Sequence, residues 1–282
     1  MKVYKANTIE ETLDILSTVS KSKVIAGGTD LILDLRNKKL DIECLVDITS
    51  IDELNRIDIL NDEYIIGSAV PFSKILEFSY SNNLKGFVKA IGQIGSPQIR
   101  NRGTIGGNLA NASTSADSAP ALLALDAKVC IASKTNSVEI PMSEFYDHLR
   151  DDLNDGIITY IKFKELSRNS YLGFEKLGFR KSLAISKLSI STNITLNERN
   201  EIENILIASG AIGKFPMREY EVESQLLNRK LDNDSIGLAI TTMKSIMSER
   251  LGRRTSLPYK QSAIEYIFKN CFEETINYFK RC

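Results

Sequence analysis

The stretch Gly103–Asp117 constrains this chain more than any other, because it places three glycines within five residues and ends in a carboxylate. Its sequence is Gly-Thr-Ile-Gly-Gly-Asn-Leu-Ala-Asn-Ala-Ser-Thr-Ser-Ala-Asp. Glycine lets a backbone approach a ligand closely, and successive N–H groups in such a turn form a concavity that binds anions. We therefore expect a loop that holds a phosphate or diphosphate group. The alternative is a tight connection between strands that binds nothing.

A second glycine pair lies far upstream, in the segment Val24–Leu31, which is Val-Ile-Ala-Gly-Gly-Thr-Asp-Leu. A strand that passes through glycines into a helix is a common way to hold a phosphate group. Two such turns could hold a diphosphate from both sides. Neither turn fits G-x-G-x-x-G or G-x-x-x-x-G-K-[ST], which excludes the ordinary dinucleotide and nucleoside-triphosphate motifs.

The two glycine segments together resemble the FAD-binding subunits of molybdenum hydroxylases. The resemblance is carried by Ala26–Leu31, by Thr104–Asn108, and by Asn111-Ala-Ser113 through Asp117. The family includes the flavin subunits of xanthine dehydrogenase, aerobic carbon monoxide dehydrogenase and nicotinate dehydrogenase. Segments 176–185 and 253–256 are also similar to family segments, so the resemblance covers nearly the whole chain. Thr114 departs from the family, which usually has proline there.

The resemblance implies an α+β fold with a two-part FAD-binding domain of the vanillyl-alcohol-oxidase (PCMH) type. An α+β C-terminal domain like that of the carbon monoxide dehydrogenase flavoprotein should follow it. A polar segment, Glu165–Ser170, is a suitable boundary. We expect a FAD-binding domain at 1–168, with α/β subdomains at about 1–55 and 56–168, and a C-terminal domain at 169–282.

Local patterns predict the main elements of these domains. Thr8 and Glu11 form a capping box, and strands are expected at 24–26, 45–48, 64–67, 128–133 and 157–163. Helices are expected near 86–94 and 120–125. Strand-rich stretches should follow at 183–196 and 202–209, and then three helices after Pro216.

The resemblance also implies which residues bind the cofactor, FAD. The glycine turns should serve the diphosphate, and Asp117 should accept hydrogen bonds from sugar or ribityl hydroxyls. The alternative role of Asp117 is to cap the helix near Pro120. Lys176 should lie near the N1–C2=O edge of the flavin and tune its potential, while Ile158 should pack on the ring or simply be buried in its strand. The expected binding residues are Ile25, Ala26, Gly27, Gly28, Thr29, Asp30, Leu31, Thr104, Gly106, Gly107, Asn108, Asn111, Ser113, Asp117, Ile158 and Lys176.

Other reactive side chains are few. The four cysteines, Cys44, Cys130, Cys271 and Cys282, form no C-x-x-C pair, so we expect neither a metal site nor an iron–sulfur cluster here. His148 is the single histidine and should lie in a polar loop. The first glycine turn contains neither histidine nor cysteine, so FAD should bind non-covalently. Arg180 and Lys181 form either a solvated basic turn or part of the flavin or partner surface.

Basic and acidic residues balance at 36 each, so no strong field favours nucleic acid or a membrane surface. No apolar run has the length of a membrane span, and we expect a cytoplasmic protein. The resemblance implies partner subunits that carry [2Fe–2S] clusters and molybdopterin, with electrons passing through this chain to NAD⁺, oxygen or another acceptor.

A xanthine dehydrogenase-type complex is the first expectation for function. The alternatives are a carbon monoxide or nicotinate dehydrogenase flavin subunit, and a free-standing FAD reductase of the same fold. A further alternative is a binding module whose glycine loops merely turn.

Overall fold

The computed structural model describes residues 1–152, 156–178 and 184–281. The chain divides into two compact units. Unit 1 comprises residues 1–78, 96–112 and 127–164, and unit 2 comprises residues 79–95, 113–126 and 165–282. Each unit is therefore built from segments that are far apart in the sequence.

Unit 1 begins with a three-stranded parallel sheet in the order β1-β3-β2. Its core contains apolar residues such as Leu13, Val46 and Leu54. The capping box is confirmed, because Thr8 Oγ1 accepts the N–H of Glu11 at 3.1 Å and the Glu11 carboxylate accepts the N–H of Asn7. The elements are β1 (Lys2–Lys5), α1 (Ile9–Thr18), β2 (Ser22–Ile25), α2 (Leu31–Arg36), β3 (Cys44–Asp47) and η1 (Asp52–Asn55).

The second sheet of unit 1 has five antiparallel strands in the order β4-β5-β8-β6-β7. The alternation predicted for 157–163 is present only in the second half of β8, where Ile161 and Phe163 are buried and Lys162 is half-buried. In the first half, residues 157–159 are all buried. The strands are β4 (Ile57–Leu60), β5 (Glu63–Gly67), β6 (Lys128–Ser133), β7 (Ser137–Pro141) and β8 (Gly156–Lys164), and the helices are α3 (Phe72–Glu77), α5 (Pro97–Arg100), α6 (Ile105–Ala110) and α8 (Met142–Asp152).

Two segments that we expected to be loops are helical. Gly106 and Gly107 lie inside α6, and His148 lies inside α8. Helix α6 forms because its first N–H groups find acceptors from distant residues: Ile105 donates to Val70 O and Gly106 to Ser68 O. Gly106 also permits this approach, since a Cβ there would lie 2.5 Å from Ser68 Cβ.

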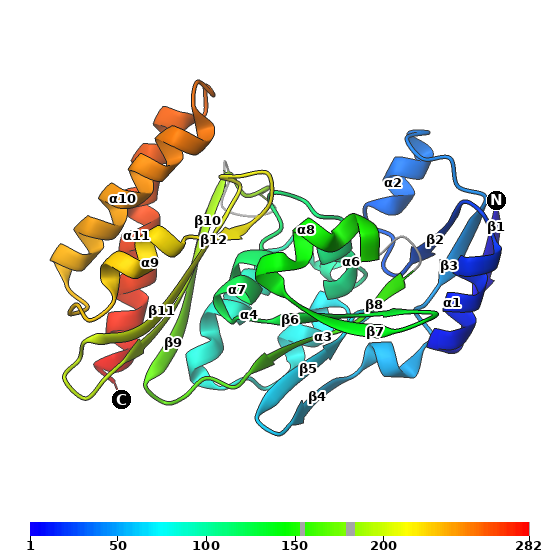
Figure 1. The fold of residues 1–282 in the computed structure, drawn as a ribbon, viewed down its shortest axis with the longest axis horizontal. Helices are drawn as coiled ribbons and strands as arrows, with labels where there is room; N and C mark the ends of the chain where they lie inside the picture. Colours follow the sequence, from blue (N-terminus) through cyan, green and yellow to red (C-terminus); the bar gives the residue numbers. More distant parts are fainter. Residues whose placement is uncertain (153–155, 179–183, 282) are drawn as a thin grey trace. The chain divides into compact units, whose positions relative to one another are not determined.

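Unit 2 is a four-stranded antiparallel sheet, in the order β12-β11-β10-β9, between two layers of helices. Helices α9, α10 and α11 cover one face, and α4 and α7 cover the other (Figure 1). The three helices expected after Pro216 are confirmed. The elements are η2 (Asn82–Leu84), α4 (Lys85–Gly92), α7 (Ser118–Ala124), β9 (Ser170–Leu177), β10 (Leu188–Leu196), β11 (Ile202–Gly210), β12 (Met217–Arg218), α9 (Tyr220–Leu226), α10 (Asn233–Leu251) and α11 (Leu257–Phe279).

Two buried ion pairs hold α9 and α10 in unit 2. The guanidinium of Arg250 forms a bidentate ion pair with the carboxylate of Glu219, with N–O distances of 2.7 and 3.0 Å. Arg218 forms a bidentate pair with Glu223 in the same way, at 2.6 and 2.7 Å. Such paired, charge-assisted geometry is what allows carboxylates to be buried. The cysteines Cys44, Cys130 and Cys271 are free and buried, as expected of small apolar residues, while Cys282 lies outside the described residues.

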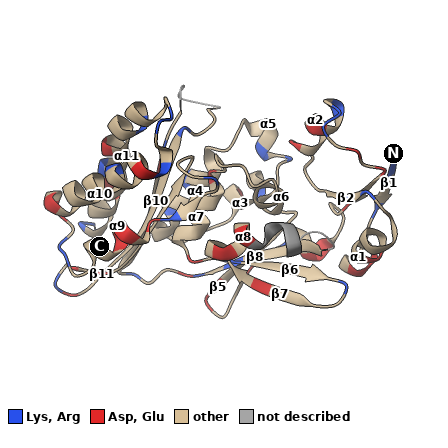
Figure 2. Cartoon of the chain, turned by 45° about the horizontal axis from the view of Figure 1, so that its top comes forward, with Lys and Arg blue, Asp and Glu red and all other residues tan. Residues whose placement is uncertain are grey.

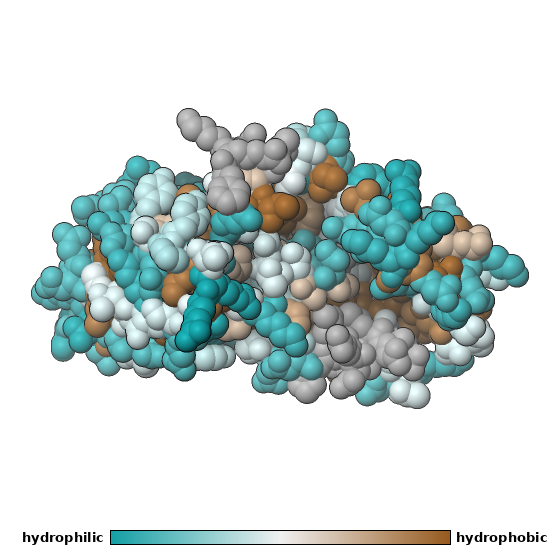
Figure 3. Space-filling view, turned by 90° about the horizontal axis from the view of Figure 1, so that it is seen from above, coloured by the Kyte–Doolittle hydropathy of each residue, from teal (hydrophilic) through white to brown (hydrophobic). Residues whose placement is uncertain are grey.

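Both signs of charge are spread over the two units (Figure 2). The face in Figure 3 is hydrophilic over much of its area, and small groups of hydrophobic residues interrupt it. In the part of the chain that the structure describes, no helix has the length and apolar character needed to cross a membrane.

Candidate cofactor site

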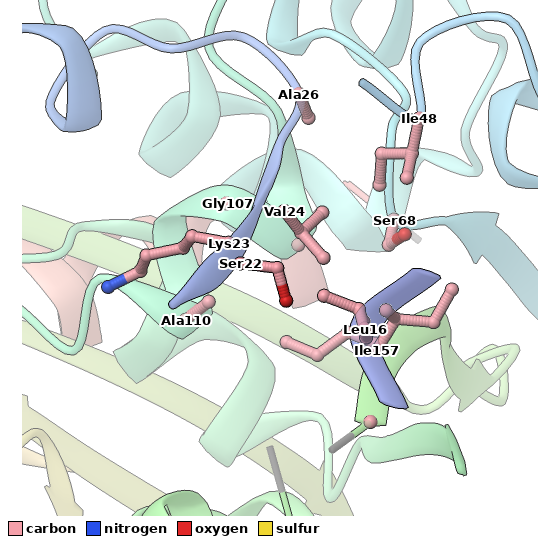
Figure 4. Close-up of a pocket in the computed structure, with 13 residues that line it drawn as sticks. Leu16, Ser22, Lys23, Val24, Ala26, Ile48, Ser68, Gly107, Ala110 and Ile157 are labelled. Carbon is pink, nitrogen blue, oxygen red and sulfur yellow. The ribbon is translucent and has the colours of Figure 1, made fainter. Parts of the chain in front are cut away.

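Unit 1 contains a cavity of about 430 Å³ beside both glycine segments (Figure 4). Four of the expected binding residues line it: Ala26 just after β2, Gly106 and Gly107 on α6, and Ile158 on β8. The structure thus brings together residues that are more than 100 positions apart in the sequence. Ile158 both lines the cavity and is buried in its strand, with 6% of its surface exposed.

The first glycine turn, which directly follows Ala26, offers free hydrogen-bond donors. Within the described residues, the backbone N–H groups of 27–30 donate to no protein group. Gly28 has φ +71°, a left-handed conformation that favours glycine. Gly27 must also be glycine, since a Cβ would lie 2.0 Å from Arg102 O. This turn therefore offers unpaired N–H groups of the kind that bind an anion.

The second glycine pair is different, because its N–H groups are already used. Gly106 donates to Ser68 O at 3.0 Å, and Gly107 donates at 3.1 Å to the hydroxyl of Thr104, which caps α6. A Cβ at Gly107 would meet only Thr104 Oγ1, at 3.0 Å. Gly107 therefore leaves space in the cavity wall, whereas the first turn supplies the free donors.

Ser68 adds a polar group to the same wall. Its hydroxyl oxygen is buried and has no hydrogen-bond partner among the described residues. Figure 4 shows Ser68 on the cavity, with Ile48 and Ala26 nearby. An unpaired buried hydroxyl is costly, so a ligand that bonds to it would recover free energy.

In unit 2, Asp117 and Lys176 form a buried ion pair. Lys176 Nζ lies 2.6 Å from Asp117 Oδ2, and it also donates to Gln93 O at 2.8 Å and Ala184 O at 3.3 Å. These three bonds satisfy all three hydrogens of the ammonium. Asp117 Oδ1 is buried and has no partner in the described part of the chain.

The structure does not show the capping role considered for Asp117, and its ligand role stays a prediction. Asp117 stands at the N-cap position of α7, but its side chain makes no capping hydrogen bond. Burial raises the pKa of Asp117 from an ordinary value near 3.8 to about 6, although Lys176 acts in the opposite direction. A desolvated carboxylate with one unused oxygen is suited to accept a hydrogen bond from a hydroxyl group.

The remaining expected residues lie near these features without lining the cavity. Ile25 ends β2, Leu31 begins α2, Asn108 lies on α6, and Asn111 is the C-cap of α6. The hydroxyls of Thr29 and Ser113 have local partners, Asp30 Oδ2 and the N–H of Ser115 respectively. Arg180 and Lys181 lie outside the described residues.

The cavity is also lined by residues that were not predicted from the sequence. Lys23 is the only charged residue among the described residues that line it, and Figure 4 shows it on β2. The strand that leads into the first glycine turn could have suggested Ser22, Lys23 and Val24, whereas Ser68 has no local signal. The missed lining residues are Leu16, Ser22, Lys23, Val24, Ile48, Ser68, Ala110, Gly156 and Ile157.

These features fit a flavin dinucleotide. The free N–H groups of the first turn suit a diphosphate, and the space above Gly107 admits a ligand close to α6. The unpaired oxygen of Ser68 suits a hydroxyl or ring partner at this cavity, and in unit 2 the unpaired oxygen of Asp117 separately suits a hydroxyl donor. A cavity of about 430 Å³ is of the size that binds part of a large cofactor.

Family models match both parts of the chain. Residues 1–163 match the FAD-binding domain of molybdopterin dehydrogenases, and residues 174–275 match the carbon monoxide dehydrogenase flavoprotein C-terminal domain. The chain is 27% identical to the nicotinate dehydrogenase FAD-subunit of Eubacterium barkeri, covering 97% of this chain and 95% of the relative. It is also 27% identical to the xanthine dehydrogenase FAD-binding subunit of Escherichia coli O157:H7, with the same coverage.

Solved structures share the fold over the full length. A chain of carbon monoxide dehydrogenase from Hydrogenophaga pseudoflava superimposes with a TM-score of 0.88 at 20% identity, covering 99% of this chain and 98% of that one. A chain of quinoline 2-oxidoreductase from Pseudomonas putida 86 gives 0.85 at 18% identity, covering 98% and 96%. The expected α+β architecture, with its FAD-binding and C-terminal parts, is confirmed. The chain is an oxidoreductase component that belongs to the family of FAD-binding subunits of molybdenum hydroxylases.

Proposed function

We propose that this chain is the FAD-carrying subunit of a xanthine dehydrogenase-type complex. In that role it binds FAD non-covalently, takes electrons from [2Fe–2S] clusters of an iron–sulfur partner, and passes them to NAD⁺ or another acceptor. A molybdopterin-bearing partner would oxidise the substrate. The observation that supports the proposal best is the first glycine turn, whose free N–H groups stand beside a cavity with an unpaired buried hydroxyl.

FAD would supply the redox chemistry, and this chain would supply binding and electrostatics. The N–H groups of residues 27–30 would hold the diphosphate. Lys23, at the cavity, adds a positive charge that favours the same anionic group. Asp117 and Lys176 would meet the ribityl chain and the flavin. The first turn contains neither histidine nor cysteine, which supports non-covalent binding.

The substrate of the complex is proposed from relatives alone. Xanthine dehydrogenase FAD-binding subunits support a purine substrate, but the nicotinate dehydrogenase relative has the same sequence identity to this chain, 27%. We retain nicotinate as the second candidate for this reason. A substrate oxidised on a partner subunit leaves no mark on the residues of this chain.

Two measurements test the proposal. Acid precipitation of the purified protein should release a yellow cofactor into the supernatant, and colour that stays in the pellet would contradict non-covalent binding. The protein purified from its native source should also carry iron- and molybdenum-containing partners. That complex should reduce NAD⁺ or a dye with xanthine faster than with nicotinate, and the reverse preference would replace the purine assignment.

A further inference from the structure

We propose that Lys260 is a positioning residue for the cofactor site and acts through Ala211 on the segment Ser113–Asp117. The inference rests on the proposed function, since that segment carries Asp117. Every contact involved lies within unit 2.

Lys260 carries a positive charge and is buried, and neighbouring residues of its own helix do not account for that burial. It stands in the first turn of α11, it is 9% exposed, and its ammonium donates to Ala211 O. Among the described residues, no carboxylate pairs with it. Burial, and then the charges of Arg254 and Lys187, lower its pKa. A cation at a helix N-terminus also opposes the helix dipole. Among the described residues, the favourable contact of the Lys260 ammonium is therefore its hydrogen bond to Ala211 O.

Ala211 connects Lys260 to the cofactor segment. Its φ is +63°, which residues other than glycine rarely adopt. Its carbonyl accepts from Lys260, and its N–H donates to Thr114 O at 2.7 Å. The hydrogen bond from Ala211 to Thr114 stabilises the turn at the position where the family usually has proline. The left-handed backbone conformation of Ala211 is unfavourable in itself. The hydrogen bond from Lys260 thus stabilises the orientation of the Ala211 carbonyl group.

The residue before Ala211, Gly210, packs near Pro120 in α7, just after the same segment. A Cβ at Gly210 would lie 2.4 Å from Ser189 Oγ and 3.1 Å from Pro120 Cγ, so its backbone packs closely there. Gly210 and Ala211, at and just after the end of β11, therefore lie against the chain both before Asp117, at Thr114, and after it, at Pro120. Ligand sites lose affinity when a contacting group moves by a fraction of an ångström, so this support would fix Asp117 for its ligand.

The test compares Lys260→Met, which keeps the length of the side chain, with Lys260→Arg, which keeps the donor. Lys269→Met, an exposed lysine on the same helix, is the control. FAD titration should show roughly tenfold weaker binding for Lys260→Met, the lower end of the loss seen when a supporting partner is removed from a metal site. The Ala211 and Asp117 amides should exchange hydrogen faster, the flavin visible circular dichroism should change, and Lys260→Arg should restore all three.

Several results would overturn the inference. FAD affinity within twofold of the wild type for Lys260→Met is one, and loss of binding in the Lys269 control to the same degree is another. If Lys260→Met does not fold, the wild type decides: FAD should slow exchange of the Ala211 amide, and unchanged exchange would refute the coupling. A wild-type chain that binds no FAD would instead refute the proposed function.

Discussion

The ammonium of Lys176 lies 2.6 Å from Oδ2 of Asp117, and the two side chains are only 8% and 7% exposed. The positive charge that we expect near a flavin is therefore partly neutralised by a carboxylate 59 positions away in the sequence. A change at either residue leaves the other buried without its partner, which is costly. Variants of both residues must therefore be compared.

Lys176→Met should make the two-electron potential of bound FAD more negative, because the lysine stabilises the charge gained on reduction. At about 4 Å and an effective dielectric near 20 the Coulomb energy is about 4 kcal/mol. Retaining a quarter of it shifts the potential by roughly 20 mV. Asp117→Asn should shift the potential in the opposite direction. Dye-equilibration titrations measure both, and an unchanged potential at full FAD occupancy would remove Lys176 from the flavin environment.

The stability of the protein should fall as the pH rises from about 4 to about 6, through the contribution of Asp117. Its pKa is near 6 in the folded chain and near 3.8 in an ordinary environment, so in this range the folded state binds more protons than the unfolded state. A pKa difference of about two corresponds to at most about 3 kcal/mol. Urea unfolding across this range measures the slope. Asp117→Asn should flatten it, and an equal slope in both proteins would contradict the assignment.

Gly107→Ala should weaken FAD binding without unfolding the protein. The new methyl group would enter the cavity wall, and overpacking by about 1–3 kcal/mol lowers affinity by roughly tenfold or more. Inside α6, alanine favours the helix by about 1 kcal/mol over glycine. Gly106→Ala is the contrasting variant: its Cβ would collide with Ser68, so it should lower the melting temperature. Calorimetric FAD titration beside thermal melts separates the two effects, and unchanged affinity in Gly107→Ala would place the ligand elsewhere.

Lys23→Met should weaken FAD binding by up to about fivefold and reduce its dependence on salt, because an exposed charge contributes at most about 1 kcal/mol. Lys21→Met is the matched control, since Lys21 is two residues away and pairs with Asp41 at 2.6 Å. Titrations at low and high ionic strength make the comparison. The same loss in both variants would show that only general charge matters.

Local signals predicted the elements well where neighbouring residues decide the structure. The capping box at Thr8 and Glu11 needs only residues within one helical turn. The alternation in the second half of β8 follows from one more deeply buried face of the sheet. The first glycine turn was also recognised, since a strand, two glycines and a helix start are adjacent in the chain.

The signals failed where distant residues decide. The glycines of α6 look like a loop until Ser68 and Val70 supply acceptors for its N-terminal N–H groups. Asp117 has the sequence context of a helix cap, but Lys176 takes its carboxylate. The roles of the single binding residues remain predictions for the same reason, as does the domain boundary at residue 168.

The discontinuous construction of unit 2 has a consequence for folding during synthesis. Helices α4 and α7 are made in the first half of the chain, yet the sheet that they cover is made in the second half. Gly86 of α4 packs so closely that a Cβ there would lie 2.3 Å from Leu172 O on β9. Until the later strands leave the ribosome, the apolar faces of both helices remain exposed to water, and non-local contacts of this kind form slowly. A fragment that ends at residue 168 would keep these helices without their sheet, so the N-terminal half should depend on the C-terminal half, or on a chaperone, to stay soluble.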